Sequence, residues 1–287
     1  MALTTLISTA VLAARLDDPA LAVFDCRFRL DDVAWGEREC TAAHVPGAVY
    51  AHLDRDLSGP KTGTNGRHPL PDVDALRATL GRLGIASGVQ VVAYDQDNGS
   101  FASRLWWLLR LMGHDAVAVL DGGFRKWIAE GRGTKSGSET RAPRAFDGSI
   151  RPGMAVDAAT VASLPGQPEW CLLDARAPER YRGETEPVDK TPGRIPGARN
   201  HPFQWNLEEN GTFKSPEALR ARLSESVGDV PADRIICYCG SGVTACHDLL
   251  ALEHAGLRGA KLYPGSWSEW SADPKRPIET GLSLLRK

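Results

Sequence analysis

The residues of this chain best suited to chemistry lie in one loop, Cys239-Gly240-Ser241-Gly242-Val243-Thr244. The apolar run before it, Ile235 to Tyr238, has the length and β-branched content of a buried strand, and the residues after it predict a helix that ends at Gly256. A strand, a tight glycine-containing loop and a helix direct successive backbone N–H groups into one hollow, which favours an anion. A cysteine at the first loop position is therefore expected as a thiolate. The stretch predicts a nucleophile held in an anion-binding loop.

Composition limits the class of protein. The chain has 287 residues, enough for two domains of ordinary size, with 42% hydrophobic and 24% charged residues. A net charge of −2 argues against non-specific binding of nucleic acid or membranes. No apolar stretch approaches the length of a membrane span, and the apolar N-terminal segment lacks the basic start of a signal peptide. We therefore expect a cytoplasmic protein with no nucleic-acid or membrane partner.

The cysteine pattern points to a working thiol rather than to a disulfide or zinc framework. Six cysteines, at positions 26, 40, 171, 237, 239 and 246, do not make a disulfide framework in a chain of this length. Their spacing resembles no structural zinc site, because Cys237-x-Cys239 lacks a second pair. Strand alternation turns Cys237 away from Cys239, so Cys237 is expected in the core. A reducing compartment fits a thiolate at Cys239.

The two halves of the chain repeat one pattern. Residues 21–27 match 170–176, each a strand ending in Asp-x-Arg, and residues 90–95 match 234–239. The Asp-x-Arg pairs occur in both halves and are expected to be structural, and short helices are expected over 6–16 and 156–164. Strands alternating with helical runs predict a parallel sheet with helices on both faces. We therefore expect two tandem α/β domains, at 1–132 and 154–287, joined by an exposed linker at 133–153.

The loop Cys-Gly-Ser-Gly-Val-Thr resembles the active-site loop of the 3-mercaptopyruvate sulfurtransferases, within the rhodanese superfamily, and the resemblance covers nearly the whole chain. It implies two tandem rhodanese-like domains and an enzyme in which Cys239 takes a sulfane sulfur from 3-mercaptopyruvate as a persulfide. The implied partners are this small anionic donor and an acceptor, which is a thiol, cyanide or a thioredoxin-like protein. Neither a metal nor an organic cofactor is implied.

The two halves of the repeat differ at the position of the candidate nucleophile. The position equivalent to Cys239 in the first half is Asp95. An aspartate cannot carry a sulfane sulfur, and its charge would repel an anionic substrate. The N-terminal domain is therefore expected to be catalytically silent, as the family's division of labour also implies.

The resemblance also assigns residues to the site. Ser241 belongs to a Cys-Ser-Asp arrangement whose aspartate would be Asp54, and His68 falls where the family places a histidine lining the cleft. Arg180 matches the family's substrate-binding arginine, and a guanidinium fork suits a carboxylate. Backbone amides for the departing anion would come from the loop residues Gly240, Gly242, Val243 and Thr244. As alternatives, Asp54 could lie in a solvated turn, His68 in an exposed loop and Arg180 on the surface.

One position departs from the family pattern. The mercaptopyruvate enzymes carry a second arginine nine residues after the first, where this chain has Asp189. Lys190 and Arg194 are nearby cations that could replace it, but neither aligns with it. The loop therefore favours 3-mercaptopyruvate as the donor, while the missing arginine keeps thiosulfate open as the alternative donor.

Two other functions compete with this interpretation. Rhodanese-like phosphatases use a Cys-x5-Arg loop whose arginine clamps the phosphoryl oxygens, and Ala245 stands at that arginine position. A non-enzymatic sulfur relay or docking module belongs to a different class, and the intact Cys-Gly-Ser-Gly loop argues against it. A sulfurtransferase remains the function that the sequence favours.

Overall fold

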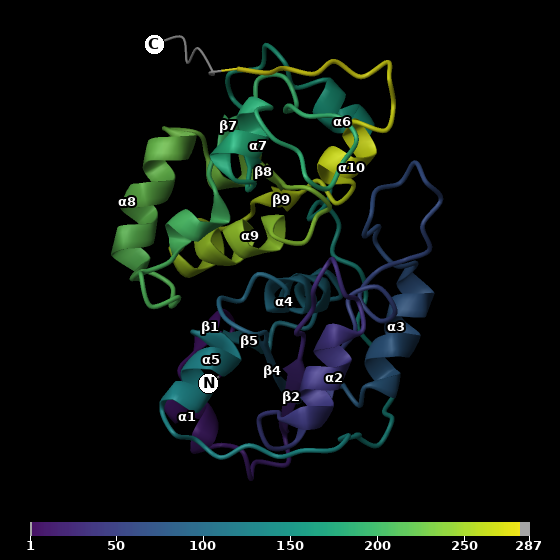
Figure 1. Ribbon diagram of the computed structural model, residues 1–287, viewed down its shortest axis with the longest axis vertical. Helices are drawn as coiled ribbons and strands as arrows, with labels where there is room; N and C mark the ends of the chain where they lie inside the picture. The colour runs from purple at the N-terminus through teal and green to yellow at the C-terminus, as the bar shows by residue number, and fades with distance from the viewer. Residues whose placement is uncertain (1, 282–287) are drawn as a thin grey trace. The chain divides into compact units, whose positions relative to one another are not determined.

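The computed structural model describes residues 2–281, which form two compact units (Figure 1). The first contains the chain up to Gly59, Leu70–Arg151 and Glu208–Phe213. The second contains Pro60–Pro69, Pro152–Leu207 and the described chain from Lys214 onward. The predicted boundaries at 132 and 154 follow chain order, whereas each compact unit includes one short segment from the other half of the sequence.

The first unit is built on a five-stranded sheet with the order β1-β5-β4-β2-β3, in which all neighbouring strands are parallel. Its strands are β1 (Leu6–Ile7), β2 (Leu21–Asp25), β3 (Ala48–Tyr50), β4 (Gln90–Tyr94) and β5 (Val117–Leu120). Its helices are α1 (Thr9–Ala13), α2 (Trp35–Ala42), α3 (Val73–Arg82), α4 (Ala102–Leu111) and α5 (Gly123–Ala129).

The second unit repeats this plan with a four-stranded parallel sheet, in the order β7-β6-β8-β9. Its strands are β6 (Cys171–Asp174), β7 (Arg199–Asn200), β8 (Ile235–Tyr238) and β9 (Lys261–Leu262). Its helices are α6 (Ala158–Ala162), α7 (Pro178–Arg182), α8 (Pro216–Val227), α9 (Ala245–His254) and α10 (Ser266–Trp270), with single 3₁₀ turns at Phe203–Asn206 and Ala232–Arg234. In place of β1, this sheet has one parallel bridge between Ala155 and Leu262.

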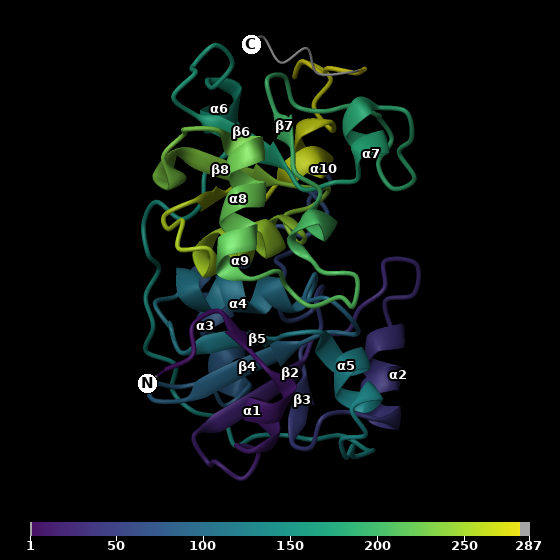
Figure 2. The ribbon, with the colours of Figure 1, turned by 90° about the vertical axis from the view of Figure 1, so that its left-hand side faces the viewer.

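Alternation along the strands gives each sheet two apolar faces. In the second unit, Leu172, Ile236 and Tyr238 pack against α6 and α10, whose Trp267 and Trp270 are fully buried. Helices α8 and α9 cover the opposite face (Figures 1 and 2). In the first unit, α1 and α5 pack on one face and α4 on the other. Parallel sheets with helices on both faces confirm the predicted fold class.

Buried ion pairs fix the carboxyl ends of the two equivalent strands β2 and β6. Arg27 Nη2 lies 2.6 Å from Asp25 Oδ2, and Arg176 Nη2 lies 2.7 Å from Asp174 Oδ2. All four side chains are almost fully buried. Because the same pair recurs in both units, its place in the structure agrees with a structural role.

The start of the chain differs from the helix expected over 6–16. Leu6 and Ile7 form β1 because they pair with β5, and the helix α1 begins only after Ser8, whose hydroxyl accepts a hydrogen bond from Val11 N. In the second unit, α6 lies within the expected 156–164 and is capped by Asp157. None of the helices at 2–281 combines the length and apolar content that a bilayer span requires.

Candidate active site

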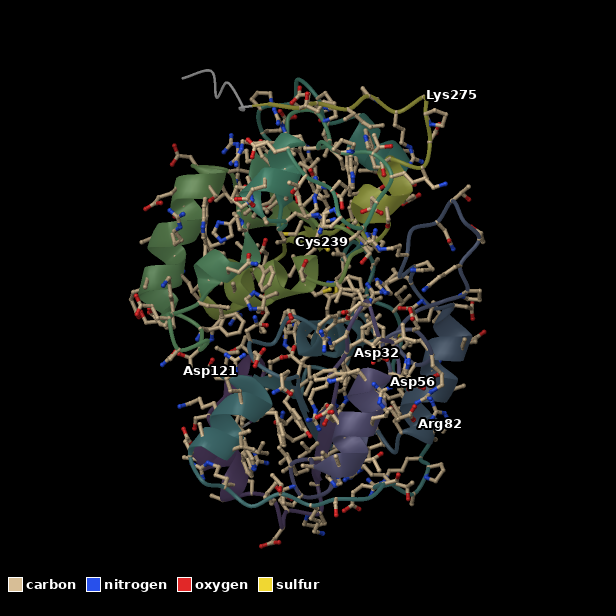
Figure 3. The ribbon with its side chains drawn as sticks, in the orientation of Figure 1. Asp32, Asp56, Arg82, Asp121, Cys239 and Lys275 are labelled. Atoms are coloured by element: carbon tan, nitrogen blue, oxygen red, sulfur yellow. The ribbon has the colours of Figure 1, made fainter. Side chains whose placement is uncertain are left out.

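Cys239 follows the last residue of β8, at the start of the loop that leads into α9 (Figure 3). The cysteine is buried, with 2% of its surface exposed. Gly242 makes the tight loop possible, because its φ is +76° and a Cβ at this position would lie 2.3 Å from Pro264 O. The strand, loop and helix expected around Cys239 are therefore present.

Hydrogen bonds hold the Cys239 backbone and sulfur in place. Gly242 N donates to Cys239 Sγ at 3.2 Å, and Cys239 N donates to Ser266 Oγ at 3.1 Å. Trp267 N donates to Cys239 O at 3.0 Å. Ser266 has a φ of +54°, a conformation that costs a non-glycine residue on the order of 1–3 kcal/mol. This strained serine fixes the amide of the candidate nucleophile.

Asp95 shows what the equivalent loop of the first unit binds. Its Oδ1 accepts hydrogen bonds from Asp97 N (3.2 Å) and Gly99 N (2.9 Å), and its Oδ2 from Phe101 N (2.7 Å) and Ala102 N (3.1 Å). Burial raises the pKa of Asp95, although these four amides act in the opposite direction. The loop between β4 and α4 is thus an anion site filled by its own side chain.

His68 and Ser241 are in direct contact. His68 Nδ1 lies 2.7 Å from Ser241 Oγ, and both residues are buried. His68 comes from the segment Pro60–Pro69, which is part of the second unit although it precedes the second half of the sequence. The structure therefore brings two predicted site residues into contact, and one of them, Ser241, is two residues after Cys239 in the loop. Their catalytic and binding roles stay predictions.

Arg180 lies beside the loop rather than on an open surface. A Cβ built on Gly240 would be 3.4 Å from Arg180 Nη2. Glu186 holds the guanidinium, with Nη2 2.6 Å from Oε1 and Nε 3.2 Å from Oε2. Burial opposes the ionisation of Glu186, but hydrogen bonds from Arg180 and from the Asp189 and Val188 amides lower its pKa below the ordinary value. Glu186 is therefore a carboxylate that fixes Arg180 next to Cys239.

Arg67 is a neighbour of the loop that the sequence did not single out. Its Nη2 lies 2.8 Å from the Cβ position at Gly240, closer than any atom of Arg180. Its Nη1 forms an ion pair with Asp189 Oδ1, and Asp189 Oδ2 lies 3.6 Å from Arg180 Nη2. Two features of the sequence could have indicated Arg67. It directly precedes the predicted site residue His68, and Asp189 stands where the family has a cation.

The two cations proposed to replace the missing arginine lie elsewhere or at the edge of the site. Arg194 is buried, donates from Nη1 to Gly281 O at 2.7 Å and lies 4.5 Å from the centre of the Tyr181 ring. Lys190 is exposed and lines, with Lys61 and Arg67, a cavity of about 470 Å³. The three heavy atoms nearest to a Cβ at Gly240 all belong to Arg67 and Arg180.

The remaining predicted residues divide between the two units. Val243 is buried and Thr244 is half-buried, and both complete the loop before α9. Asp54 belongs to the first unit, where it follows β3, is half-buried and donates from its backbone N to His52 Nδ1 at 3.1 Å. The place of Asp54 in the catalytic arrangement stays a prediction.

A chain of buried polar groups links the turn after β7 to α9. His201 Nε2 lies 2.9 Å from Asn206 Oδ1, and Asn206 Nδ2 donates to Asp248 Oδ1 at 2.8 Å. Burial lowers the pKa of His201 to about 4. Burial also raises the pKa of Asp248 well above its ordinary value, with the nearby Cys239 as a smaller cause. The uncharged forms of both side chains are therefore favoured near the loop.

The other cysteines of the second unit are core residues. Burial raises the pKa of the Cys237 thiol well above its ordinary value and that of Cys171 to about 11. Cys246, on the first turn of α9, donates from Sγ to Gly242 O at 3.4 Å. All six cysteines of the chain are free thiols. The position of Cys237 in the buried strand agrees with the expectation that it packs in the core.

The chain matches the model of the rhodanese-like domain twice, over residues 8–130 and 157–273. A protein of Pseudomonas aeruginosa named as a probable 3-mercaptopyruvate sulfurtransferase is 47% identical over 283 residues, which are 98% of this chain and 100% of that protein. The thiosulfate sulfurtransferase of Cricetulus griseus is 36% identical over 291 residues, covering 97% of this chain and 96% of that protein.

A solved structure shows the same likeness. The crystal structure of SseA from Escherichia coli, described as a 3-mercaptopyruvate sulfotransferase with the rhodanese fold, superposes with a TM-score of 0.80 and 29% sequence identity. The match covers 92% of this chain and 99% of that one. The similarity therefore extends over most of the chain.

Proposed function

The chain belongs to the rhodanese-like domain family, and on this premise we propose that it moves a sulfane sulfur from 3-mercaptopyruvate, through a persulfide on Cys239, to a thiol or cyanide. The relatives confirm the expected tandem domains and the expected enzyme class, a sulfurtransferase. The donor, the acceptor and the roles of individual residues are proposed.

The donor is inferred from the two guanidinium groups beside Gly240. Arg67 and Arg180 lie next to the residue that follows the thiol, so a small anion bound there would place its other end near Cys239. 3-Mercaptopyruvate carries a carboxylate and a thiol on one three-carbon chain, and a guanidinium fork binds a carboxylate through two hydrogen bonds. The resemblance also implies that thiosulfate-type enzymes of this fold carry basic side chains inside the loop. This loop contains none, which weighs against thiosulfate as the donor.

The chemistry proceeds in two displacements. The Cys239 thiolate attacks the donor sulfur, the S–C bond breaks, and its electron pair leaves as the enolate of pyruvate, which takes up the donor's thiol proton. The product on the enzyme is the persulfide, with a new S–S bond. An acceptor thiolate or cyanide then attacks the outer sulfur, the S–S bond breaks, and its electron pair returns to Cys239 as thiolate.

The hydrogen bonds to the Asp95 carboxylate in the first unit suggest where the anionic outer sulfur of the persulfide binds in the second unit. Counted back from the first residues of the following helices, Ala102 of α4 and Ala245 of α9, Gly99 corresponds to Gly242, because the first loop is one residue longer. Gly99 N donates to Asp95 Oδ1, and Gly242 N donates to Cys239 Sγ. The two amides that bind Asp95 Oδ2 match those of Thr244 and Ala245, at the start of α9. We therefore propose that the outer sulfur of the persulfide binds to these two amides, where the helix N-terminus also favours negative charge.

Other residues have supporting roles in this proposal. In this proposal Ser241, which is hydrogen-bonded to His68, passes a proton to or from the donor sulfur. Asp54, from the first unit, completes the predicted Cys-Ser-Asp arrangement, whereas the loop of that unit with Asp95 at the position equivalent to Cys239 carries no sulfur and is catalytically silent. The protein works in a reducing, cytoplasmic compartment, because the thiolate must not be consumed by disulfide formation. Its acceptor is a small thiol, cyanide or a thioredoxin-like protein.

Steady-state sulfur transfer to cyanide, from 3-mercaptopyruvate and from thiosulfate in parallel, tests the donor. We expect a much higher kcat/KM for 3-mercaptopyruvate. A preference for thiosulfate would reject the proposed donor and leave the reaction class intact. If neither donor is turned over with cyanide or with a small thiol, the chain is a relay or docking module instead.

The nucleophile is tested by replacing Cys239 with Ser, with Cys171→Ala as the matched control in the core of the same unit. The Cys239 variant should lose transfer from either donor, and it should no longer gain the mass of one sulfur atom on incubation with donor alone. The Cys171 variant should retain both properties. Substantial turnover by the Cys239 variant would end the persulfide mechanism.

A further inference from the structure

Arg67 reaches the loop because its segment is built into the second unit. Gly66, with a φ of +85°, approaches the turn before α10 so closely that a Cβ would lie 2.8 Å from Gly265 O. Arg67 N donates to Ser268 Oγ at 3.0 Å, and Ser268 N donates to Gly240 O at 2.9 Å. The backbone of Arg67 and the loop of Cys239 are thus tied to the same serine.

Asp189 holds the guanidinium of Arg67 in this place. The two side chains form an ion pair, and only 8% of the Asp189 side chain is exposed, against 26% of the Arg67 side chain. The other Asp189 oxygen lies 3.6 Å from Arg180 Nη2, so one carboxylate contacts both cations. A shared carboxylate offsets the repulsion between two guanidinium groups that lie beside one glycine.

The residue that interrupts the family pattern therefore has a structural consequence. Where an arginine is expected nine residues after Arg180, Asp189 instead pairs with an arginine from a segment more than a hundred positions earlier in the chain. Arg194 is held by other groups, and Lys190 is not among the atoms nearest to Gly240. The second cation at the loop is Arg67.

We propose that Arg67 and Arg180 together bind the carboxylate of the sulfur donor, and that Asp189 is a positioning residue that holds Arg67 for this purpose. The inference rests on the proposed function and specifies its donor-binding site. It predicts that charge alone is insufficient at position 67, because the fork geometry of a guanidinium orients a carboxylate and a lysine does not.

The first test compares donors with and without a carboxylate. The variants are Arg67→Gln and Arg67→Lys, with Arg258→Gln as control, since the Arg258 side chain is 80% exposed in the same unit. With 3-mercaptopyruvate, we expect KM to rise at least about tenfold in Arg67→Gln while kcat changes little, because one charge-assisted contact to the carboxylate is lost. With mercaptoacetone, which has the same thiol and ketone but no carboxylate, KM should not change. Equal effects on both donors, or none, would overturn the proposal.

Asp189→Asn separates positioning from simple charge. Removing a negative charge near an anion site should lower KM for 3-mercaptopyruvate if Asp189 acts through its field alone. If Asp189 instead holds Arg67 in place, KM should rise, and the rise should be absent when the substitution is made in the Arg67→Gln background. A KM that falls or stays constant would remove Asp189 from the proposed arrangement.

Alkylation of Cys239 tests the same clamp without sulfur transfer. Iodoacetate carries a carboxylate and iodoacetamide does not, so the ratio of their rate constants at Cys239 reports carboxylate binding near the thiol. The ratio should fall at least about tenfold in Arg67→Gln and be unchanged in Arg258→Gln. An unchanged ratio in Arg67→Gln overturns the clamp even if 3-mercaptopyruvate is a substrate. A lowered ratio supports the clamp even if the proposed donor fails.

Discussion

His68 Nδ1 lies 2.7 Å from Ser241 Oγ, with both residues buried in the second unit. The contact joins positions 173 residues apart in the chain. A buried hydroxyl with a hydrogen-bond partner at this distance has one preferred orientation, so His68 controls where the Ser241 hydroxyl points. We therefore expect the loop serine and the histidine to act as one group.

Replacing either member of this pair should impair the other. We expect Ser241→Ala and His68→Ala each to lower kcat/KM for sulfur transfer by about tenfold or more, because a positioned proton-transfer group is lost or misdirected. The double variant should be little worse than either single variant, with a coupling energy of about 0.5–3 kcal/mol. The measurement is a double-mutant cycle on kcat/KM, with His254→Gln at the other end of α9 as a control. Additive losses would mean that the two side chains act independently.

Asp95→Ala should affect stability and not chemistry. The four amides that bind the Asp95 carboxylate lose their acceptor, so the free energy of unfolding should fall by at least about 1–3 kcal/mol. Turnover per folded molecule should stay within about twofold of the unaltered protein, since the loop of Asp95 is proposed to carry no sulfur. Urea denaturation and steady-state kinetics on the same sample check both statements. A large loss of kcat at full folding would give Asp95 a part in the reaction.

Much of this architecture follows from local sequence patterns. The strand at Ile235–Tyr238 was predicted with the bounds that the structure has, because a short apolar run between polar residues and a glycine-rich loop admits few alternatives. The alternation of strands with helical runs predicted a parallel sheet, and the structure adds that β6 pairs with β8, so that Cys239 lies at the carboxyl end of a central strand. By contrast, β1 spans only two residues, too few to show a period.

The position of Arg67 could not be predicted in the same way. Its contact with Asp189 joins residues 122 positions apart, and neither residue type is unusual in its own segment. The contact exists because Pro60–Pro69 packs within the second unit, which depends on close approaches at single glycines such as Gly66. Asp189 stands where an arginine is expected, and only the tertiary structure shows that it forms an ion pair with another arginine, Arg67.

Removing Arg27 should destabilise the first unit strongly. Asp25 is fully buried, so Arg27→Met leaves a buried carboxylate without its cation and should cost about 3–5 kcal/mol of the free energy of unfolding. Substituting Asp25→Asn in the same chain should recover part of this loss, because the buried charge is then absent. Arg38→Gln breaks the exposed pair with Asp32 and should change the free energy of unfolding by less than about 1 kcal/mol. Urea denaturation of the four proteins checks the order, and an equal loss for Arg27→Met and Arg38→Gln would contradict it.

His201 should make stability depend on pH in a defined window. Burial lowers the pKa of His201 to about 4 in the folded protein, whereas the unfolded chain takes up this proton near pH 6.5. Between these values the unfolded state binds more protons, so the free energy of unfolding falls as the pH is lowered from about 6.5 to about 4, by at most about 1.4 kcal/mol per pH unit. The His201→Gln side chain does not take up a proton, so the free energy of unfolding of this variant should fall less over that window, by a total of about 3 kcal/mol. At neutral pH the variant should be less stable than the unaltered protein, because the contact of His201 Nε2 with Asn206 is altered. Above about pH 7 the difference between the two proteins should be constant, because the histidine is uncharged in both states. Urea titrations at several pH values measure the two slopes, and parallel curves below about pH 6 would show that His201 takes up its proton equally in the folded and unfolded states.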